Sequence, residues 1–174
     1  MLRNGPLPVA PSMFAAPNSL LVTGPNALLI ASGNYNSQTN LNITAWDGIH
    51  SYLGPNSTYS PGCVNVTSND TSGFAAAVAA AKLSKLVVAV MGLDTTVEFE
   101  DSTRTVLSLP GVQEQLILAL AASGTAIILV LISGSAISLS LAVQSAVTAI
   151  LWIGYGGEEA GTALADVIFG ECNY

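Results

Sequence analysis

The stretch FAAAVAAAKLSKLVVAVM, residues 74–91, decides the fold. Its first half is rich in alanine, the strongest helix former, and Ser72 just before it is a candidate N-cap. Its second half is an apolar, largely β-branched run without polar alternation, which is typical of a strand buried on both faces of a parallel sheet. The stretch therefore predicts a helix that leads into a buried strand over 85–91.

The same alternation continues toward the carboxyl terminus. Further helices are expected at 110–122, 136–145 and 162–169, and further buried strands at 125–132 and 146–153. A short strand is expected within 20–31, broken at the Gly24-Pro25-Asn26 turn, and a helix near 45–53 interrupts the polar loops of 32–72. Alternating helices and buried strands predict an α/β fold with a mostly parallel sheet.

Composition limits what kind of protein this is. The chain has 174 residues, enough for one domain with a real core, and only 9% are charged, against about 25% in typical proteins. The net charge of −7, with four Lys and Arg, argues against a nucleic-acid partner. Residues 116–157 carry no charge, but SGT, SGS and SLS break the run, so we expect strands and no membrane span.

A cluster of sequons points to the secretory pathway. Four N-x-S/T sequons begin at Asn42, Asn56, Asn65 and Asn69. They predict a glycosylated, secreted protein, although loops rich in Asn, Ser and Thr also generate sequons by chance. In an oxidising compartment, Cys63 and Cys172 are the candidates for one disulfide. The first 17 residues do not resemble a signal peptide, so we expect any signal to be removed or to lie outside this chain.

Three loops are expected at one edge of the sheet. GLDTTVEFEDSTR (92–104), SGS (133–135) and GYGGEEAG (154–161) each follow an expected strand. Parallel sheets bind ligands beyond the carboxyl ends of their strands, so these loops predict a site. GYGGEEAG lacks the nucleotide-binding patterns, and we interpret it as a tight turn with Glu158 and Glu159 in the first turn of a helix.

The charges of 92–104 form the candidate chemistry. Glu98 and Glu100 are two residues apart and would face the same side of an extended segment. A pair of carboxylic acids suits glycosidic chemistry, in which one protonates a leaving oxygen. Arg104 either holds one carboxylate or pairs on the surface, and the alternative for the whole loop is a solvated strand end. No His/Cys/Asp cluster has metal spacing, so neither a metal nor a cofactor is expected.

Several pieces, in order, then resemble one known domain. They are VTGPNA (22–27), SGNYN (32–36), AWDGI (45–49), SPGC (60–63), VVAVMGLDTTVEFE (87–100), LPGVQEQLI (109–117), LVLISG (129–134) and AILWIGYGGEEAGTALADVIFG (149–170). This set resembles the carboxyl-terminal α/β sandwich domain of glycoside hydrolase family 3, in the β-xylosidase/β-glucosidase branch. The resemblance implies a three-layer α/β/α sandwich over residues 21–174. Residues 1–20, which are rich in proline and asparagine, are expected to form an irregular arm.

The resemblance also implies a mechanism. In the family, hydrolysis of β-linked sugars is retaining, and the nucleophile is an aspartate on a separate (β/α)₈ barrel domain. The sandwich domain supplies the acid/base glutamate, which falls on Glu98 here, with Glu100 as the second choice. Asp94 and Arg104 match other residues of the family loop and are expected to bind substrate.

Departures from the family pattern leave two functions open. No barrel is present, and Thr103 stands where the branch usually has an acid. The family pattern SGGPIDVSFA is replaced here by SGSAISLSLA (133–142), with Ser138 in place of an aspartate. The chain stops at FGECNY where the family continues, which predicts an open sheet edge that a barrel domain or a homo-oligomer would cover. We therefore expect a domain of a secreted β-glycosidase with a carbohydrate substrate or, alternatively, a non-catalytic glycoprotein that self-assembles.

Overall fold

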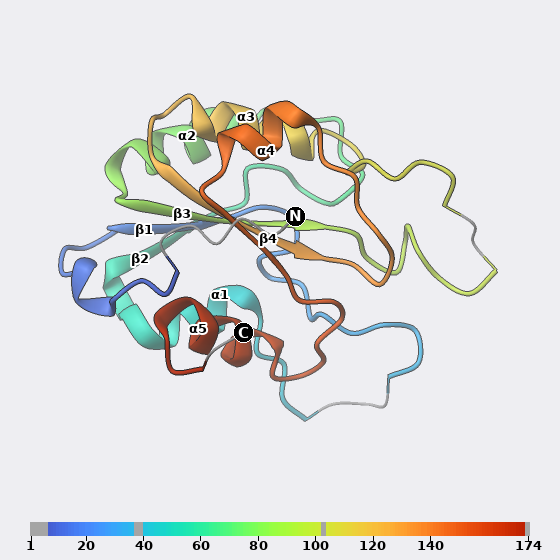
Figure 1. The fold of residues 1–174 in the computed structure, drawn as a ribbon, viewed down its shortest axis with the longest axis horizontal. Coiled ribbons are helices and arrows are strands. Elements are labelled where there is room, and N and C mark those ends of the chain that lie inside the picture. Colours follow the sequence, from blue (N-terminus) through green and yellow to red (C-terminus); the bar gives the residue numbers. More distant parts are fainter. Residues whose placement is uncertain (1–6, 37–39, 102–103, 173–174) are drawn as a thin grey trace.

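A parallel sheet forms the middle layer of the computed structural model, which describes residues 7–36, 40–101 and 104–172 (Figure 1). Its strands are β1 (Leu20–Thr23), β2 (Ser57–Ser60), β3 (Leu86–Gly92), β4 (Ala126–Ile132) and β5 (Ala149–Trp152). Their order is β2-β1-β3-β4-β5, and every neighbouring pair is parallel. The α/β class and the parallel sheet predicted from the sequence are confirmed.

Helices cover both faces of this sheet. They are α1 (Ala45–Leu53), α2 (Phe74–Leu83), α3 (Gln113–Ala121), α4 (Leu141–Ala146) and α5 (Ala160–Phe169). Figure 1 shows α2, α3 and α4 on one face, and α1 and α5 on the other. The three-layer α/β/α sandwich is therefore confirmed.

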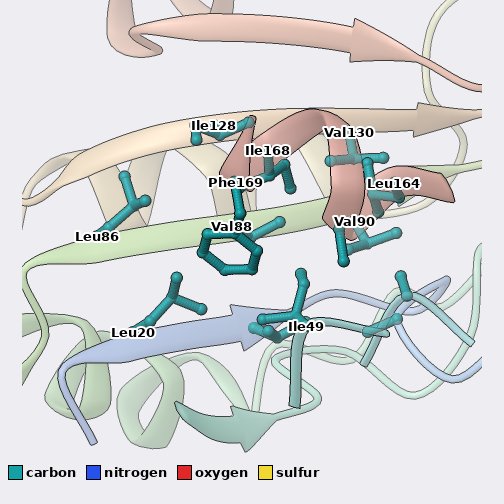
Figure 2. Packing of buried hydrophobic residues seen from close by; sticks show 14 of the residues in the cluster. Leu20, Ile49, Leu86, Val88, Val90, Ile128, Val130, Leu164, Ile168 and Phe169 are labelled. Carbon is teal, nitrogen blue, oxygen red and sulfur yellow. The ribbon is translucent and has the colours of Figure 1, made fainter. Parts of the chain in front are cut away.

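Alternate strand residues supply two separate cores. Val88 and its alternate neighbours face α1 and α5, where Leu164, Ile168 and Phe169 pack against them (Figure 2). Val87 and its alternate neighbours face α2, α3 and α4 on the other side. Strands buried on both faces must be apolar at every position, which explains the continuous runs in the sequence.

Glycines let α1 and α5 approach closely. A Cβ atom on Gly48 would lie 2.0 Å from the carbonyl oxygen of Gly161, and one on Gly161 would lie 1.9 Å from that of Thr44. The backbone N–H of Gly161 also donates to the carbonyl of Ile43 at 3.0 Å. The two helices are thus in backbone contact, and a side chain at either position would separate them.

Several element boundaries differ from those predicted. β2 was missed, because its STYS sequence is polar and reads as a loop. The helix after Pro110 begins only at Gln113, since Gly111 adopts a left-handed φ of 60° in the preceding turn. The helix expected at 136–145 is shortened to α4, whose N-cap is Ser140. For α2 the N-cap is Gly73, while the hydroxyl of Ser72 donates to Asp70 at 2.8 Å.

The described part of the N-terminal arm packs on the α5 side. Residues 7–19 contain one short 3-10 helix, Pro11–Met13, and bury the side chains of Val9 and Phe14. The Phe14 ring meets the Phe169 ring edge-on at 6.4 Å between centroids. The division into an arm at 1–20 and a domain at 21–174 stays a prediction, with residues 1–6 outside the described part.

The predicted disulfide is wrong. Cys63 and Cys172 are both free thiols, Cys63 buried and Cys172 exposed. Cys63 belongs to the core on the α2 and α3 side, whereas Cys172 follows α5 on the opposite face. Because the sheet lies between the two layers, these thiols are not placed to bond.

The apolar run of 116–157 is divided among short elements. No helix in the described residues has the length and apolar character needed to cross a bilayer. In the described part of the chain, β5 is an edge strand of the sheet, and its Trp152 is 57% exposed. That a barrel domain or a homo-oligomer covers this edge stays a prediction.

Candidate active site

The three loops expected at one sheet edge meet at a single carboxylate. Glu98 lies in the loop after β3, and its side chain reaches the loop after β4 at Gly134 and Ser135. It also reaches Tyr155 in the loop after β5. Parallel strands bring all three loops to this edge, so residues up to 57 positions apart in the chain share one site.

Four hydrogen bonds hold Glu98. Its Oε1 accepts from the backbone N–H of Gly134 at 2.6 Å and from the phenol of Tyr155 at 2.5 Å. Its Oε2 accepts from the backbone N–H of Ser135 at 3.0 Å and from the Ser135 hydroxyl at 2.5 Å. Every bond is donated to the carboxylate, which is the form that accepts at both oxygens.

These contacts set the protonation state of the site. Partial burial alone raises the pKa of Glu98, but the hydrogen bonds outweigh it, and the pKa lies below the ordinary value of 4.5. Burial, followed by the bond to Glu98, raises the pKa of the Tyr155 phenol, which therefore remains a donor. At neutral pH the described site thus holds an anionic Glu98.

A cleft of about 880 Å³ opens beside this carboxylate. It is lined by Ser32, Gly33, Asn34, Tyr35, Asn36, Asn40, Glu98, Phe99, Glu100, Gly134, Tyr155, Gly156, Gly157 and Glu158. Amide, hydroxyl and aromatic groups beside acids are the groups that hydrogen-bond sugar hydroxyls and pack on sugar rings. The cleft therefore suits a polar, ring-shaped ligand.

Glu98 and Glu100 both line the cleft but differ in their partners. The backbone N–H groups of Val97 and Glu98 both donate to the carbonyl of Asp94, in a turn that leads into Glu98. Glu100 is exposed and bonds to Tyr35, which raises the pKa of that phenol. Glu98 is thus fixed within the domain, whereas Glu100 lies at the rim.

The two predicted substrate-binding residues have structural partners. The Asp94 carboxylate accepts from the backbone N–H and hydroxyl of Thr96, at 2.9 and 2.5 Å, and so shapes the turn. Arg104 donates to the carbonyl of Val106 at 2.9 Å, to the hydroxyl of Ser135 at 3.2 Å and to the carbonyl of Ala136. Their contact with a sugar stays a prediction.

One of the two departures from the family pattern falls on described residues. Thr103 is outside the described residues, and Ser138 is exposed on the loop after β4. In the loop after β5, α5 begins at Ala160, two residues earlier than predicted, and Glu159 is its N-cap. Glu158 lines the cleft instead of lying within the helix. The carboxylate of Glu159 accepts from the Thr162 hydroxyl at 2.6 Å.

The sequon asparagines lie in loops away from the sheet interior. Asn42, Asn65 and Asn69 are exposed, and Asn56 is half-buried at the end of a short 3-10 helix. Glycosylation at these positions stays a prediction.

No group of three or more His, Cys, Asp or Glu side chains within residues 7–36, 40–101 and 104–172 is arranged to hold a metal ion.

Comparison with known proteins decides the family. The glycosyl hydrolase family 3 C-terminal domain matches residues 1–174. The chain belongs to this family.

Relatives of the family 3 domain are named as xylosidases. It is 38% identical over 177 residues to the probable β-D-xylosidase 7 of Arabidopsis thaliana, covering 99% of this chain and 23% of that protein. It is 37% identical over 171 residues to β-D-xylosidase 1 of the same plant, covering 96% of this chain and 21% of that protein. The chain therefore spans less than a quarter of the length of these relatives.

Solved structures have the same fold. The family 3 exo-β-xylosidase XlnD, in complex with a xylobiose aziridine activity-based probe, superposes with a TM-score of 0.86 and 31% identity. The alignment covers 98% of this chain and 22% of that one. A β-glucosidase from Erythrobacter marinus gives 0.84 and 29%, with 98% of this chain and 26% of that one covered.

Sequence reasoning missed two residues that hold Glu98 in this family 3 domain. Ser135 was placed in the right loop but given no role, and Tyr155 was treated only as part of a turn. A hydrogen-bonding side chain among glycines, directly after a parallel strand, was the available signal in both loops. Their common target, Glu98, depends on loop conformations that the sequence pattern does not specify.

Proposed function

We propose that this chain is the carboxyl-terminal domain of a secreted β-xylosidase- or β-glucosidase-type enzyme. In this proposal, Glu98 is the acid/base residue for hydrolysis of β-linked sugars. The observation that carries it is the convergence of three loops on the Glu98 carboxylate, at the mouth of a polar cleft. The substrate class comes from the relatives, which are named as β-D-xylosidases.

The chemistry divides between two domains. A retaining glycosidase needs two carboxyl groups about 5–5.5 Å apart, one as nucleophile and one as acid/base. Glu98 would protonate the leaving oxygen and then, as a carboxylate, take a proton from the attacking water. The nucleophile would come from a barrel domain of the same protein, facing the cleft.

The protonation state of Glu98 fits the second of these steps. Held by four donors, Glu98 is an anion and therefore a base. To act as an acid it must first gain a proton. A nucleophile carboxylate about 5–5.5 Å away would favour that proton, because a neighbouring negative charge raises the pKa of a carboxylic acid. Assembly with the barrel domain would thus prepare the acid form.

A chimera tests the proposal. This chain replaces the matching segment of the Arabidopsis β-D-xylosidase 1, and turnover of 4-nitrophenyl β-xyloside and β-glucoside is measured. Glu98→Gln is expected to lower kcat by roughly 10²–10⁴-fold, the usual contribution of general acid–base catalysis. The matched variant Glu100→Gln, two residues away at the rim of the same cleft, is expected to keep most of the activity.

A second substrate identifies the role. With a dinitrophenyl glycoside, whose leaving group needs no proton, azide should restore turnover to Glu98→Gln by replacing the base-activated water. An active chimera in which Glu98→Gln has no effect, or in which only Glu100→Gln is inactive, would refute the assignment of Glu98.

A further inference from the structure

The hydroxyl of Ser135 hydrogen-bonds both the guanidinium of Arg104 and the carboxylate of Glu98. We propose that Ser135 is a positioning residue that links the guanidinium of Arg104 to the carboxylate of Glu98 through its hydroxyl. The link joins Glu98 and Arg104, both in the loop after β3, through the loop after β4. Its functional meaning rests on the proposed role of Glu98, but its existence does not.

The direction of each hydrogen bond is fixed by the chemistry of the partners. A guanidinium has only donors, so the hydroxyl of Ser135 accepts from Arg104, at 3.2 Å. An ionised carboxylate only accepts, so the same hydroxyl donates its proton to Glu98, at 2.5 Å. Hydrogen bonds in such a chain polarise one another, and the cation therefore strengthens the bond to Glu98.

Arg104 is well placed to act through this link. Its guanidinium also donates to the carbonyls of Val106, at 2.9 Å, and Ala136. These bonds fix the cation on the far side of Ser135, so that the serine hydroxyl lies between it and Glu98. Tyr155 and the backbone N–H of Gly134 hold the other oxygen of Glu98, so the carboxylate cannot turn away without losing bonds on both sides.

Other ionisable groups lie on the loops of this site. Asp94 and Glu100 lie on the same loop as Glu98, and Glu158 lines the cleft from the loop after β5. Tyr35 faces the cleft from residues 32–36, and Tyr155 contacts Glu98 directly. Burial favours a protonated Glu98, and the hydrogen bonds from Ser135, Tyr155 and Gly134 outweigh it.

The link depends on Ser135, where the family pattern quoted above has a glycine. In the family pattern SGGPID, which corresponds to residues 133–138, the third position is a glycine, which has no hydroxyl to accept from the arginine or donate to the glutamate. A serine at this position favours the anion of Glu98. It therefore favours the base step over the acid step of the proposed reaction.

The titration of Glu98 tests the link directly. The chain is labelled with carbon-13 at the glutamate carboxyl groups, and the pH midpoint of the Glu98 titration is measured by NMR. The variant Glu98→Gln identifies the Glu98 signal, which it lacks. Ser135→Gly and Ser135→Ala are expected to raise the midpoint. The control Ser138→Gly, the same change three residues along the loop with an exposed side chain, is expected to leave it unchanged.

A double-mutant cycle separates the link from a direct field effect. Arg104→Gln should raise the midpoint when Ser135 is present, and should raise it much less in Ser135→Ala. Circular dichroism checks that each variant is folded. An equal effect of Arg104→Gln in both backgrounds, or no shift on removing the Ser135 hydroxyl, would overturn the proposal. Because no turnover is measured, either result leaves the proposed function to its own test.

Discussion

The close contact between α1 and α5 allows a stability prediction to be worked out from the structure. A methyl group at Gly161 would lie 1.9 Å from the carbonyl oxygen of Thr44, where real contacts start at 3.0 Å. The helices must therefore separate by about 1.1 Å, the difference between these two distances. The separation also stretches the hydrogen bond from Gly161 to the carbonyl of Ile43.

The expected cost follows from these two effects. Overpacking costs about 1–3 kcal/mol and the weakened hydrogen bond about 1 kcal/mol, offset by about 1 kcal/mol because alanine is the better helix former. We expect Gly161→Ala to lower the free energy of unfolding by about 2 kcal/mol. For a domain of this size that corresponds to a fall in Tm of about 4–8 °C.

Thermal unfolding followed by circular dichroism measures this change, with Gly33→Ala as the control. Gly33 lies outside the left-handed region, and a Cβ there would lie 3.6 Å from the Tyr155 ring, an ordinary contact. The control should stay within about 0.5 kcal/mol of the wild type, as most changes without a clash do. A Tm of Gly161→Ala equal to or above that of the wild type would refute the reasoning about helix contact.

Two further predictions concern titratable side chains away from the site. A maleimide should label the exposed Cys172 quickly in the native chain, and the buried Cys63 only on unfolding. Burial also raises the pKa of the Cys63 thiol to about 11, which slows its reaction. A disulfide between the two cysteines, found by peptide mapping, would contradict this prediction. The phenol of Tyr52 donates to Asp166 at 2.6 Å, a bond that raises its pKa from 10.0 to about 12. Asp166→Asn should lower the pKa of Tyr52, as measured by ultraviolet titration. In the wild type, this bond stabilises the fold fully below pH 10.0, and the stabilisation is lost as the pH rises toward 12.

The central strands were predicted almost to the residue, whereas the polar edge strand β2 was not predicted. Strands expected at 85–91 and 125–132 are observed at Leu86–Gly92 and Ala126–Ile132, because burial on both faces leaves a continuous apolar signal. β2 borders only β1, and its serines and threonine carry no such signal. Its place in the sheet comes from pairing with β1, which local sequence does not reveal.

The site divides in the same way. That three loops share one edge followed from the parallel sheet alone, and the structure brings them to Glu98 as expected. Which groups bind the carboxylate depends on the turn that begins at Asp94 and leads into Glu98. Hydrogen bonds between loops far apart in the sequence are tertiary facts, and they determine the partners of Glu98.

The strand order also bears on how this chain folds while it is being made. β3 adds to β1, β4 to β3 and β5 to β4, so each later strand finds its neighbour already synthesised. The layer of α1 and α5 is different, because Leu164, Ile168 and Phe169 are synthesised only after all five strands. Until then the apolar side chains of Val88 and its neighbours are only half covered. A nascent chain that pauses before α5 is therefore the form most exposed to aggregation and most dependent on chaperones.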